Sequence, residues 1–193
     1  MSKPSDRGCE GGNGACRAVR RGHFSGRAAA LVLGLLVAAA RVPAADAPVI
    51  GRLAPEFALP AFAGPNVRLS EYRGDVVALS FWSSRCGTCA AQLAALDGLL
   101  ATYRSAGLVT LAVSVDDDLE RAGRFAREHP ARFPLLVDRT KEVSRAFGID
   151  RLPSIVLIDR AGVVRYVYRD FQSSDSAYVA RLRTLLDDTL REP

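Results

Sequence analysis

Short apolar runs alternate with stretches of helical periodicity from about Val49 to the end of the chain. The clearest run, at 76–82 (VVALSFW), is continuous, β-prone and of strand length. Such a run predicts a strand that is buried on both faces of a sheet. Residues 108–115 (LVTLAVSV) predict a second buried strand. Shorter strands are expected at 67–70, 133–137, 154–158 and 163–168.

Helical patterns separate these runs. The first follows Cys86 and ends before Gly107. Its apolar residues have the spacing of one face of an amphipathic helix, at positions 89, 93, 96, 100 and 103. Two further helices are expected at 116–129, which opens with three aspartates, and at 141–147. A last helix is expected at the C-terminus, where leucines recur at helical spacing.

The elements therefore follow the order strand, helix, strand, helix, strand, helix, strand, strand, helix. Strands that alternate with helices indicate parallel crossovers and a sheet covered on both faces. A turn at 159–162 joins the last two strands, which predicts an antiparallel hairpin. We expect an α/β protein with a mixed central sheet flanked by helices on both faces. This is a thioredoxin-like fold with an inserted strand-helix unit.

The net charge of +5 is confined to the N-terminal leader. Residues 1–44 hold seven basic and two acidic side chains, whereas the remaining 149 residues hold 19 of each. A domain without excess positive charge has no electrostatic footprint for a phosphate backbone. Nucleic acid is therefore excluded as a partner.

The leader has the pattern of an export signal. Three arginines precede an uncharged run at 28–40 (AAALVLGLLVAAA), and small residues follow it. Thirteen residues are too few to span a bilayer, which needs about 20. We expect a signal peptide or an N-terminal membrane anchor at 1–45 and a thioredoxin-like domain at 46–193. The domain would then work in the periplasm or at the extracytoplasmic face of the membrane.

Cleavage of the leader would leave two of the four cysteines. Cys9 and Cys16 lie in the leader, and Cys86 and Cys89 form a C-x-x-C pair in the domain. A purely structural disulfide over so short a loop stabilises a fold little. A structural zinc site needs four ligands, and besides carboxylates the mature chain adds only His129. We therefore expect no metal and no other cofactor, and we assign the pair a chemical role.

The cysteine pair lies where a buried strand is followed by a helix. Only a thiolate attacks a disulfide, and a free thiol titrates near pH ~8.5. We place Cys86 in the first turn of the helix, where unpaired backbone N–H groups and the helix dipole stabilise an anion. Arg85 adds a positive charge next to it. Cys89, one turn further on, is predicted to be the more buried thiol that resolves a mixed disulfide.

Five motifs carry a family resemblance that covers nearly all of residues 51–190. They are GRLAPEF at 51–57, LSEYRG at 69–74, FW at 81–82 with the cysteine pair, FPLLVD at 133–138 and LPSIVLID at 152–159. With these motifs the chain resembles the TlpA/ResA-like branch of the thioredoxin superfamily, a redoxin and AhpC-TSA-like group. That branch includes disulfide reductases of cytochrome c maturation.

The resemblance implies a cis peptide bond between Leu152 and Pro153, beside the cysteines. It also implies that Leu152 offers backbone hydrogen bonds to a bound polypeptide. We assign Trp82, Arg85, Leu152 and Pro153 as candidate substrate-binding residues. For Trp82, packing in the core is the alternative to stacking on a substrate.

Three sites depart from the family pattern, and a fourth departs from thioredoxin itself. Arg85 stands where Trp is usual, and the dipeptide Gly87-Thr88 stands where the second residue is usually Pro. Gln92 replaces a Glu that often accepts a proton, and Ser80 occupies the position of a buried Asp in thioredoxin itself. Proton transfer to or from Cys89 is therefore expected to use water or another group. The aspartates at 116–118 are interpreted as helix capping.

We interpret the chain as an exported thiol-disulfide oxidoreductase, specifically a reductase of exported proteins and a candidate for cytochrome c maturation. Its expected partners are thiols and disulfides of exported proteins and a redox partner in the membrane or periplasm, and we expect a monomer. One alternative is a thiol peroxidase, because Ser83-Ser-Arg-Cys86 resembles the T-x-x-C of peroxiredoxins. A second is a non-enzymatic metal chaperone for copper, although such relatives use C-x-x-x-C and a distant His.

Overall fold

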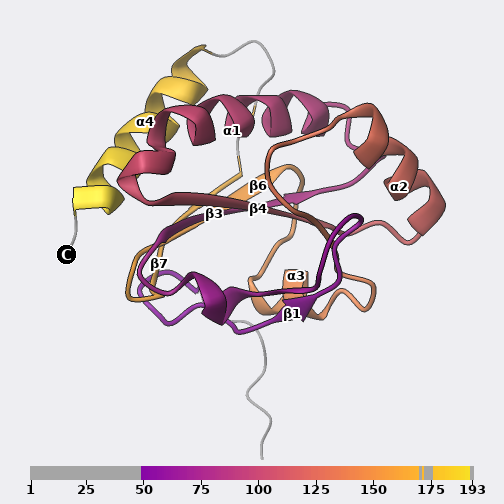
Figure 1. Cartoon of the computed structure of the whole chain (residues 1–193), viewed down its shortest axis with the longest axis horizontal. Helices are drawn as coiled ribbons and strands as arrows, with labels where there is room; N and C mark the ends of the chain where they lie inside the picture. The colour runs from indigo at the N-terminus through magenta and orange to yellow at the C-terminus, as the bar shows by residue number, and fades with distance from the viewer. Residues whose placement is uncertain (1–48, 170, 172–175, 192–193) are drawn as a thin grey trace, which may run out of the picture. The chain divides into compact units, whose positions relative to one another are not determined.

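A five-stranded mixed sheet forms the centre of the computed structural model, which describes residues 49–169, 171 and 176–191 (Figure 1). The strand order is β5-β4-β3-β6-β7. Strands β4 and β5 run parallel to β3, whereas β6 is antiparallel to β3 and β7 is antiparallel to β6. The strands are β3 (Val76–Trp82), β4 (Leu108–Ser114), β5 (Leu135–Val137), β6 (Ser154–Ile158) and β7 (Val164–Tyr168). The predicted mixed sheet is confirmed.

Strand β3 divides the core in two because all seven of its residues are buried. Its side chains alternate between the faces of the sheet. Val77, Leu79 and Phe81 enter one apolar cluster, whereas Ala78 and Trp82 enter the other. The continuous apolar run in the sequence follows from this double burial.

Helices cover both faces of the sheet. One face carries α1 (Cys89–Tyr103), α2 (Leu119–Glu128) and α4 (Ser176–Arg191), whose buried side chains join the cluster of Trp82. The opposite face carries α3 (Glu142–Ala146) and the small hairpin of β1 (Ala58–Leu59) and β2 (Val67–Arg68), as Figure 1 shows. Helix α1 follows β3 in the chain after a short loop, 83–88. This loop brings the C-x-x-C motif to one end of the sheet.

One of the shorter predicted strands differs from the structure. The strand expected at 67–70 stops after two residues and continues as a 3-10 turn, Leu69–Tyr72. Leu69 is almost fully buried and donates its backbone N–H to the carbonyl oxygen of Phe57, so this turn still packs against the core.

The leader and domain boundary at 1–45 lie outside the described residues. Within the part of the chain that the structure describes, none of the helices is long and apolar enough to cross a membrane.

Candidate active site

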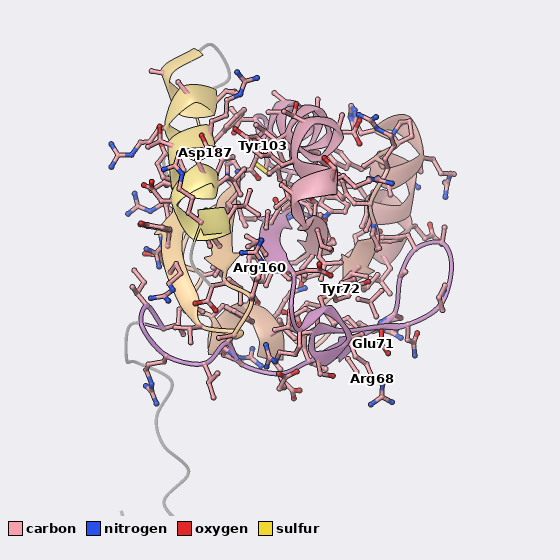
Figure 2. All side chains as sticks on the ribbon, turned by 60° about the vertical axis from the view of Figure 1, so that its left-hand side comes forward. Arg68, Glu71, Tyr72, Tyr103, Arg160 and Asp187 are labelled. Atoms are coloured by element: carbon pink, nitrogen blue, oxygen red, sulfur yellow. A yellow bond between two sulfur atoms is a disulfide. The ribbon has the colours of Figure 1, made fainter. Side chains whose placement is uncertain are left out.

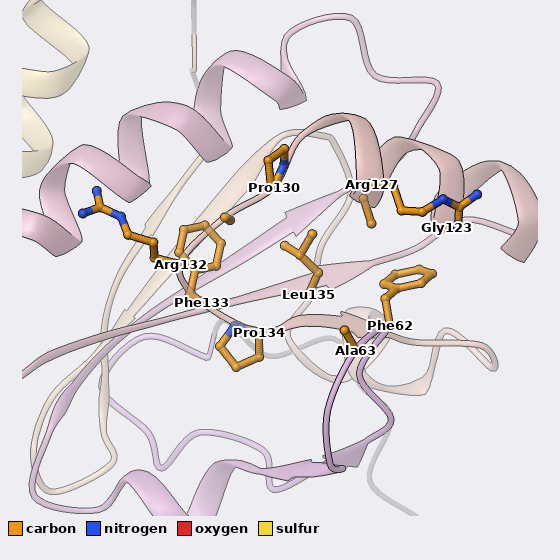
Figure 3. A pocket seen from close by; sticks show the side chains of 11 residues that line it. Phe62, Ala63, Gly123, Arg127, Pro130, Arg132, Phe133, Pro134 and Leu135 are labelled. Atoms are coloured by element: carbon orange, nitrogen blue, oxygen red, sulfur yellow. The ribbon is translucent and has the colours of Figure 1, made fainter.

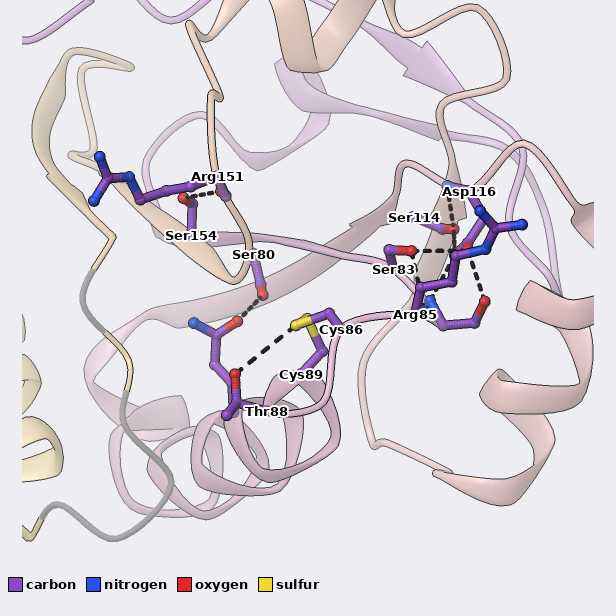
Figure 4. Close-up of a disulfide and its surroundings, with 12 residues drawn as sticks. Ser80, Ser83, Arg85, Cys86, Thr88, Cys89, Ser114, Asp116, Arg151 and Ser154 are labelled. Carbon is purple, nitrogen blue, oxygen red and sulfur yellow. Dashed lines mark hydrogen bonds between the residues drawn. A yellow bond between two sulfur atoms is a disulfide. The ribbon is translucent and has the colours of Figure 1, made fainter.

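The two cysteines of the C-x-x-C motif are joined by a disulfide at the end of β3 (Figure 4). Their Cα atoms are 5.4 Å apart. Cys86 is partly exposed, whereas Cys89 is completely buried in the apolar cluster under α1. Cys89 is therefore the more buried of the two cysteines, as we predicted.

The local backbone differs from our expectation. Helix α1 begins at Cys89, with Thr88 as its N-terminal cap, so Cys86 lies in the turn before the helix and not in its first turn. The backbone N–H of Cys89 donates to the carbonyl oxygen of Cys86 at 3.3 Å. The sulfur of Cys86 is bonded to that of Cys89 and lies 3.9 Å from the hydroxyl oxygen of Thr88. The attacking sulfur is thus still held at the positive end of α1.

A buried carboxylate fixes the loop before Cys86. Asp116 follows β4 and is 6% exposed. Its oxygens accept hydrogen bonds from the hydroxyls of Ser83 (2.9 Å), Ser84 (2.7 Å) and Ser114 (2.9 Å) and from the backbone N–H of Ser84 (2.9 Å). Burial on its own would raise the pKa of Asp116, but these donors outweigh it and hold the pKa below its ordinary value. Asp116 therefore stays ionised and ties the loop to β4.

The aspartates at 116–118 have separate roles. Asp118 caps α2, because its side chain accepts a hydrogen bond from the backbone N–H of Arg121 at 3.0 Å. The capping interpretation is wrong for Asp116, which contacts the cysteine loop. The side chain of Asp117 is exposed and pairs with Lys141 at 3.2 Å. The role of Asp116 was missed from the sequence, where its one signal is its place as the first acid after a buried strand.

Arg85 lies beside Cys86 in the chain but extends away from the disulfide (Figure 4). Its exposed side chain helps to line a cavity of about 260 Å³ with Asp116 and its two acidic neighbours. The positive charge that we expected beside the thiolate is therefore shared with carboxylates. The N-terminus of α1 is left as the main source of positive potential at Cys86.

Trp82 lies deeper than a substrate-binding residue requires. Its side chain is fully buried and stacks on Phe125, with ring centroids 4.8 Å apart and planes inclined by 23°. Phe62 lies on the same ring at 6.0 Å. A buried indole cannot stack on a bound polypeptide, so the structure favours the alternative of core packing for Trp82.

The peptide bond between Leu152 and Pro153 is cis, as the resemblance implied. Leu152 is partly exposed and, like Cys86, packs against the apolar cluster that contains Cys89. Ser154, which follows Pro153, pairs with Phe81 in the sheet. This pairing places the cis-proline loop beside the end of β3. Leu152 and Pro153 thus lie beside the end of β3, from which the cysteine loop leaves, whereas their predicted contacts with a substrate stay predictions.

The two positions that lack the family's acids contact each other. The hydroxyl of Ser80 donates to the side-chain oxygen of Gln92 at 2.8 Å, and both residues are fully buried. Gln92 lies on α1 one turn after Cys89, and Ser80 lies on β3 beneath the helix. An uncharged pair therefore occupies the interior next to the buried cysteine.

Among the described residues, no group of three or more His, Cys, Asp or Glu side chains is arranged to hold a metal ion. The ring of His129, at the end of α2, contacts that of Phe125, with centroids 4.4 Å apart and planes inclined by 55°.

Comparison with known proteins agrees with this geometry. A profile of the AhpC/TSA family matches residues 50–167. The thiol-disulfide oxidoreductase ResA of Geobacillus thermodenitrificans is 34% identical over 118 residues, which are 61% of this chain and 68% of the relative. The chain belongs to the AhpC/TSA family, in its ResA-like, thioredoxin-fold branch.

Two solved structures have the same fold. A Chlorobium tepidum protein described as thiol:disulfide interchange protein DsbE has a TM-score of 0.68 and 32% identity, covering 73% of this chain and 97% of its own. A Bacteroides thetaiotaomicron protein described as a protein disulfide isomerase has a TM-score of 0.64 and 27% identity, covering 74% and 91%. With the Cys86–Cys89 disulfide, these relatives identify a thiol-disulfide oxidoreductase of the ResA/DsbE type.

Proposed function

We propose that this ResA-like protein is exported and reduces disulfides of other exported proteins. The unequal exposure of the two sulfurs carries the proposal, because Cys86 is accessible and Cys89 is buried. Export is supported by the leader pattern at 1–45. A second thiol protein of the membrane or periplasm would return the pair to the dithiol state.

The reaction consists of two exchanges. The Cys86 thiolate attacks one sulfur of a substrate disulfide, forms a mixed disulfide and releases the other substrate sulfur as a thiolate. Cys89 loses its proton and attacks the sulfur of Cys86, which releases the second substrate thiolate. The substrate gains two electrons, and Cys86 and Cys89 are oxidised to the disulfide. Ser80 and Gln92 carry no charge, so we assign acceptance of the Cys89 proton to water that enters as the mixed disulfide forms.

The peroxidase alternative requires the hydroxyl of Ser83 to face the sulfur of Cys86. In the structure this hydroxyl donates to Asp116 at 2.9 Å and accepts from the backbone N–H of Arg85 at 3.2 Å. The hydroxyl of Ser83 is therefore already hydrogen-bonded to Asp116 and to the loop backbone. This geometry favours disulfide exchange over peroxide reduction.

Parallel assays of the reduced protein separate the two activities. We expect reduction of insulin disulfides at a useful rate and only slow consumption of hydrogen peroxide. Cys86→Ser should abolish turnover, and Cys89→Ser should stop it at the mixed disulfide. Fast peroxide turnover that survives Cys89→Ser, without insulin reduction, would contradict the proposal in favour of a peroxidase.

The substrates can be captured in cells. Cys89→Ser leaves a mixed disulfide unresolved, so partners stay attached to Cys86 and can be identified after purification, with the Cys86→Ser/Cys89→Ser variant as the control. We propose exported proteins as the trapped class, with apocytochromes c as one candidate group. Recovery of cytosolic proteins alone would contradict this assignment.

Export has its own test. N-terminal sequencing of the protein from expressing cells should give a mature start near Ala45 in an extracytoplasmic fraction. An intact Met1 on protein from the cytosol would contradict export and leave the disulfide chemistry untouched.

A further inference from the structure

A charged cavity adjoins the cis-proline loop. It has a volume of about 410 Å³ and is formed by β7, α4 and the residues that precede Leu152. Its lining residues are Asp150, Arg151, Val167, Tyr168, Arg169 and Arg181. Neither the disulfide nor its supporting hydrogen bonds include any of these residues.

The cavity has an excess of positive charge. Its lining holds three guanidinium groups and one carboxylate. The carboxylate of Asp150 lies 3.0 Å from the guanidinium of Arg169 and 3.9 Å from that of Arg151, so it already pairs with two of the three arginines. Arg181 lies 5.9 Å above the ring of Tyr168 and has no carboxylate within 4.0 Å in the described part of the chain. An additional carboxylate would give Arg181 a charged partner and reduce the excess of positive charge in the lining.

Arg151 connects the cavity to the active site. It directly precedes Leu152, which packs against the same apolar cluster as Cys86. Figure 4 shows its side chain leaving the cis-proline loop on the side away from the disulfide. A polypeptide whose disulfide lies at Cys86 and which passes over Leu152 therefore continues towards these arginines.

We propose that this arginine-lined cavity binds an acidic side chain of the substrate polypeptide, close in sequence to the disulfide that is reduced. The inference rests on the proposed function and names its substrate class. Arginine suits this role because its planar guanidinium can bind a carboxylate through two parallel hydrogen bonds. Complementary charge of this kind favours encounter and selects among substrates.

Two disulfide-containing peptides of equal length provide the test, one with Glu and one with Lys on both sides of the disulfide. We expect kcat/KM for the acidic peptide to exceed that for the basic peptide by about fivefold at low salt. This ratio corresponds to the free energy of one or two exposed ion pairs. The preference should shrink as salt is raised, because such pairs are screened. Arg151→Glu/Arg181→Glu should reverse it, and Arg151→Gln/Arg181→Gln should remove it.

The matched control is Arg124→Glu/Arg127→Glu, which makes the same charge change on α2, across α1 from α4 (Figure 1). This variant should keep the preference of the wild type. Circular dichroism of all variants verifies the fold. Equal rates for both peptides in the wild type, or a preference that Arg151→Glu/Arg181→Glu leaves intact, would overturn the inference and leave the oxidoreductase function standing.

A binding measurement separates this inference from the proposed function. Fluorescence anisotropy of labelled acidic and basic peptides, with Ser in place of both Cys, needs no turnover. Tighter binding of the acidic peptide that is lost in Arg151→Glu/Arg181→Glu would support the cavity even if neither disulfide peptide were reduced. Equal binding of both peptides would overturn it.

Discussion

The two cysteines of the disulfide have neighbourhoods of different chemistry. The loop that carries Cys86 is held by an ionised carboxylate, Asp116, which accepts four hydrogen bonds. The interior beside Cys89 contains an uncharged pair, the hydroxyl of Ser80 and the amide of Gln92. Figure 4 shows the first network and the second pair on opposite sides of the disulfide.

The difference shows where this fold accepts a buried charge. A carboxylate is stable out of water when several donors satisfy its oxygens, as they do at Asp116. A single hydroxyl donor, such as that of Ser80, is matched by a neutral amide. The charged network holds the loop of the accessible cysteine, whereas the pair next to the buried cysteine carries no charge.

Removal of the Asp116 side chain should have the largest effect on stability. Asp116→Ala leaves three serine hydroxyls and one backbone N–H without their acceptor in a part-buried loop. We expect a loss of about 2–4 kcal/mol in the free energy of unfolding. Urea unfolding measures the change. Asp117→Ala is the control, because that side chain is 96% exposed and should change stability by less than about 0.5 kcal/mol.

The neutral pair should show a smaller effect with a distinctive pattern. Gln92→Met leaves the buried hydroxyl of Ser80 without its acceptor and should cost about 1–3 kcal/mol of stability. Ser80→Ala/Gln92→Met removes both partners and should recover part of that loss. A double variant as unstable as the sum of the single variants would contradict the coupling between the two side chains.

The hydrogen bonds to Asp116 should also make the stability of the protein depend on pH. Hydrogen bonds hold the pKa of Asp116 below its ordinary value, against the opposing effect of burial. Its contribution to stability is therefore complete above the unfolded pKa of about 3.9 and is lost as pH falls through the folded pKa. Asp116→Asn should show a flatter decline of stability between about pH 5 and pH 2 than the wild type. Parallel slopes would contradict the lowered pKa.

The smallest effect is expected at Thr88, whose hydroxyl lies 3.9 Å from the sulfur of Cys86. In the reduced protein this hydroxyl can donate to the thiolate and stabilise it. On a Cys89→Ser background, Thr88→Val should lower the rate of alkylation of Cys86 at pH 7 by about two- to threefold. Thr88→Ser should keep the rate. An unchanged rate in Thr88→Val would show that the Thr88 hydroxyl does not stabilise the Cys86 thiolate.

The sequence predicts most of this architecture because strong local patterns coincide with the fold. Residues 76–82 are apolar at every position but Ser80, since both faces of β3 are covered, and the C-x-x-C spacing identifies the reacting pair. The first turn of the helix was misplaced, because helical periodicity does not distinguish a turn at Cys86 from a helix that begins at Cys89.

Asp116 and the arginine-lined cavity were not predictable from local patterns. The donors to Asp116 come mainly from Ser83 and Ser84, more than 30 residues away in the chain. Arg151 lies in the loop before β6 and Arg181 lies on α4, and the two come together only in the folded protein. Trp82 was ambiguous for a related reason, since an aromatic residue beside a site can either stack on a ligand or fill the core.

The relative reactivity of the two thiols tests the account most directly. Cys89→Ser and Cys86→Ser each leave one free thiol, and the rate of alkylation by iodoacetamide against pH reports its thiolate fraction and access. We predict that Cys86 reacts with a midpoint below the ~8.5 of a free thiol, and that Cys89 reacts far more slowly at every pH because it is buried. A Cys89 that reacts as fast as Cys86, or a Cys86 midpoint at or above the free-thiol value, would contradict the assignment of Cys86 as the attacking thiol.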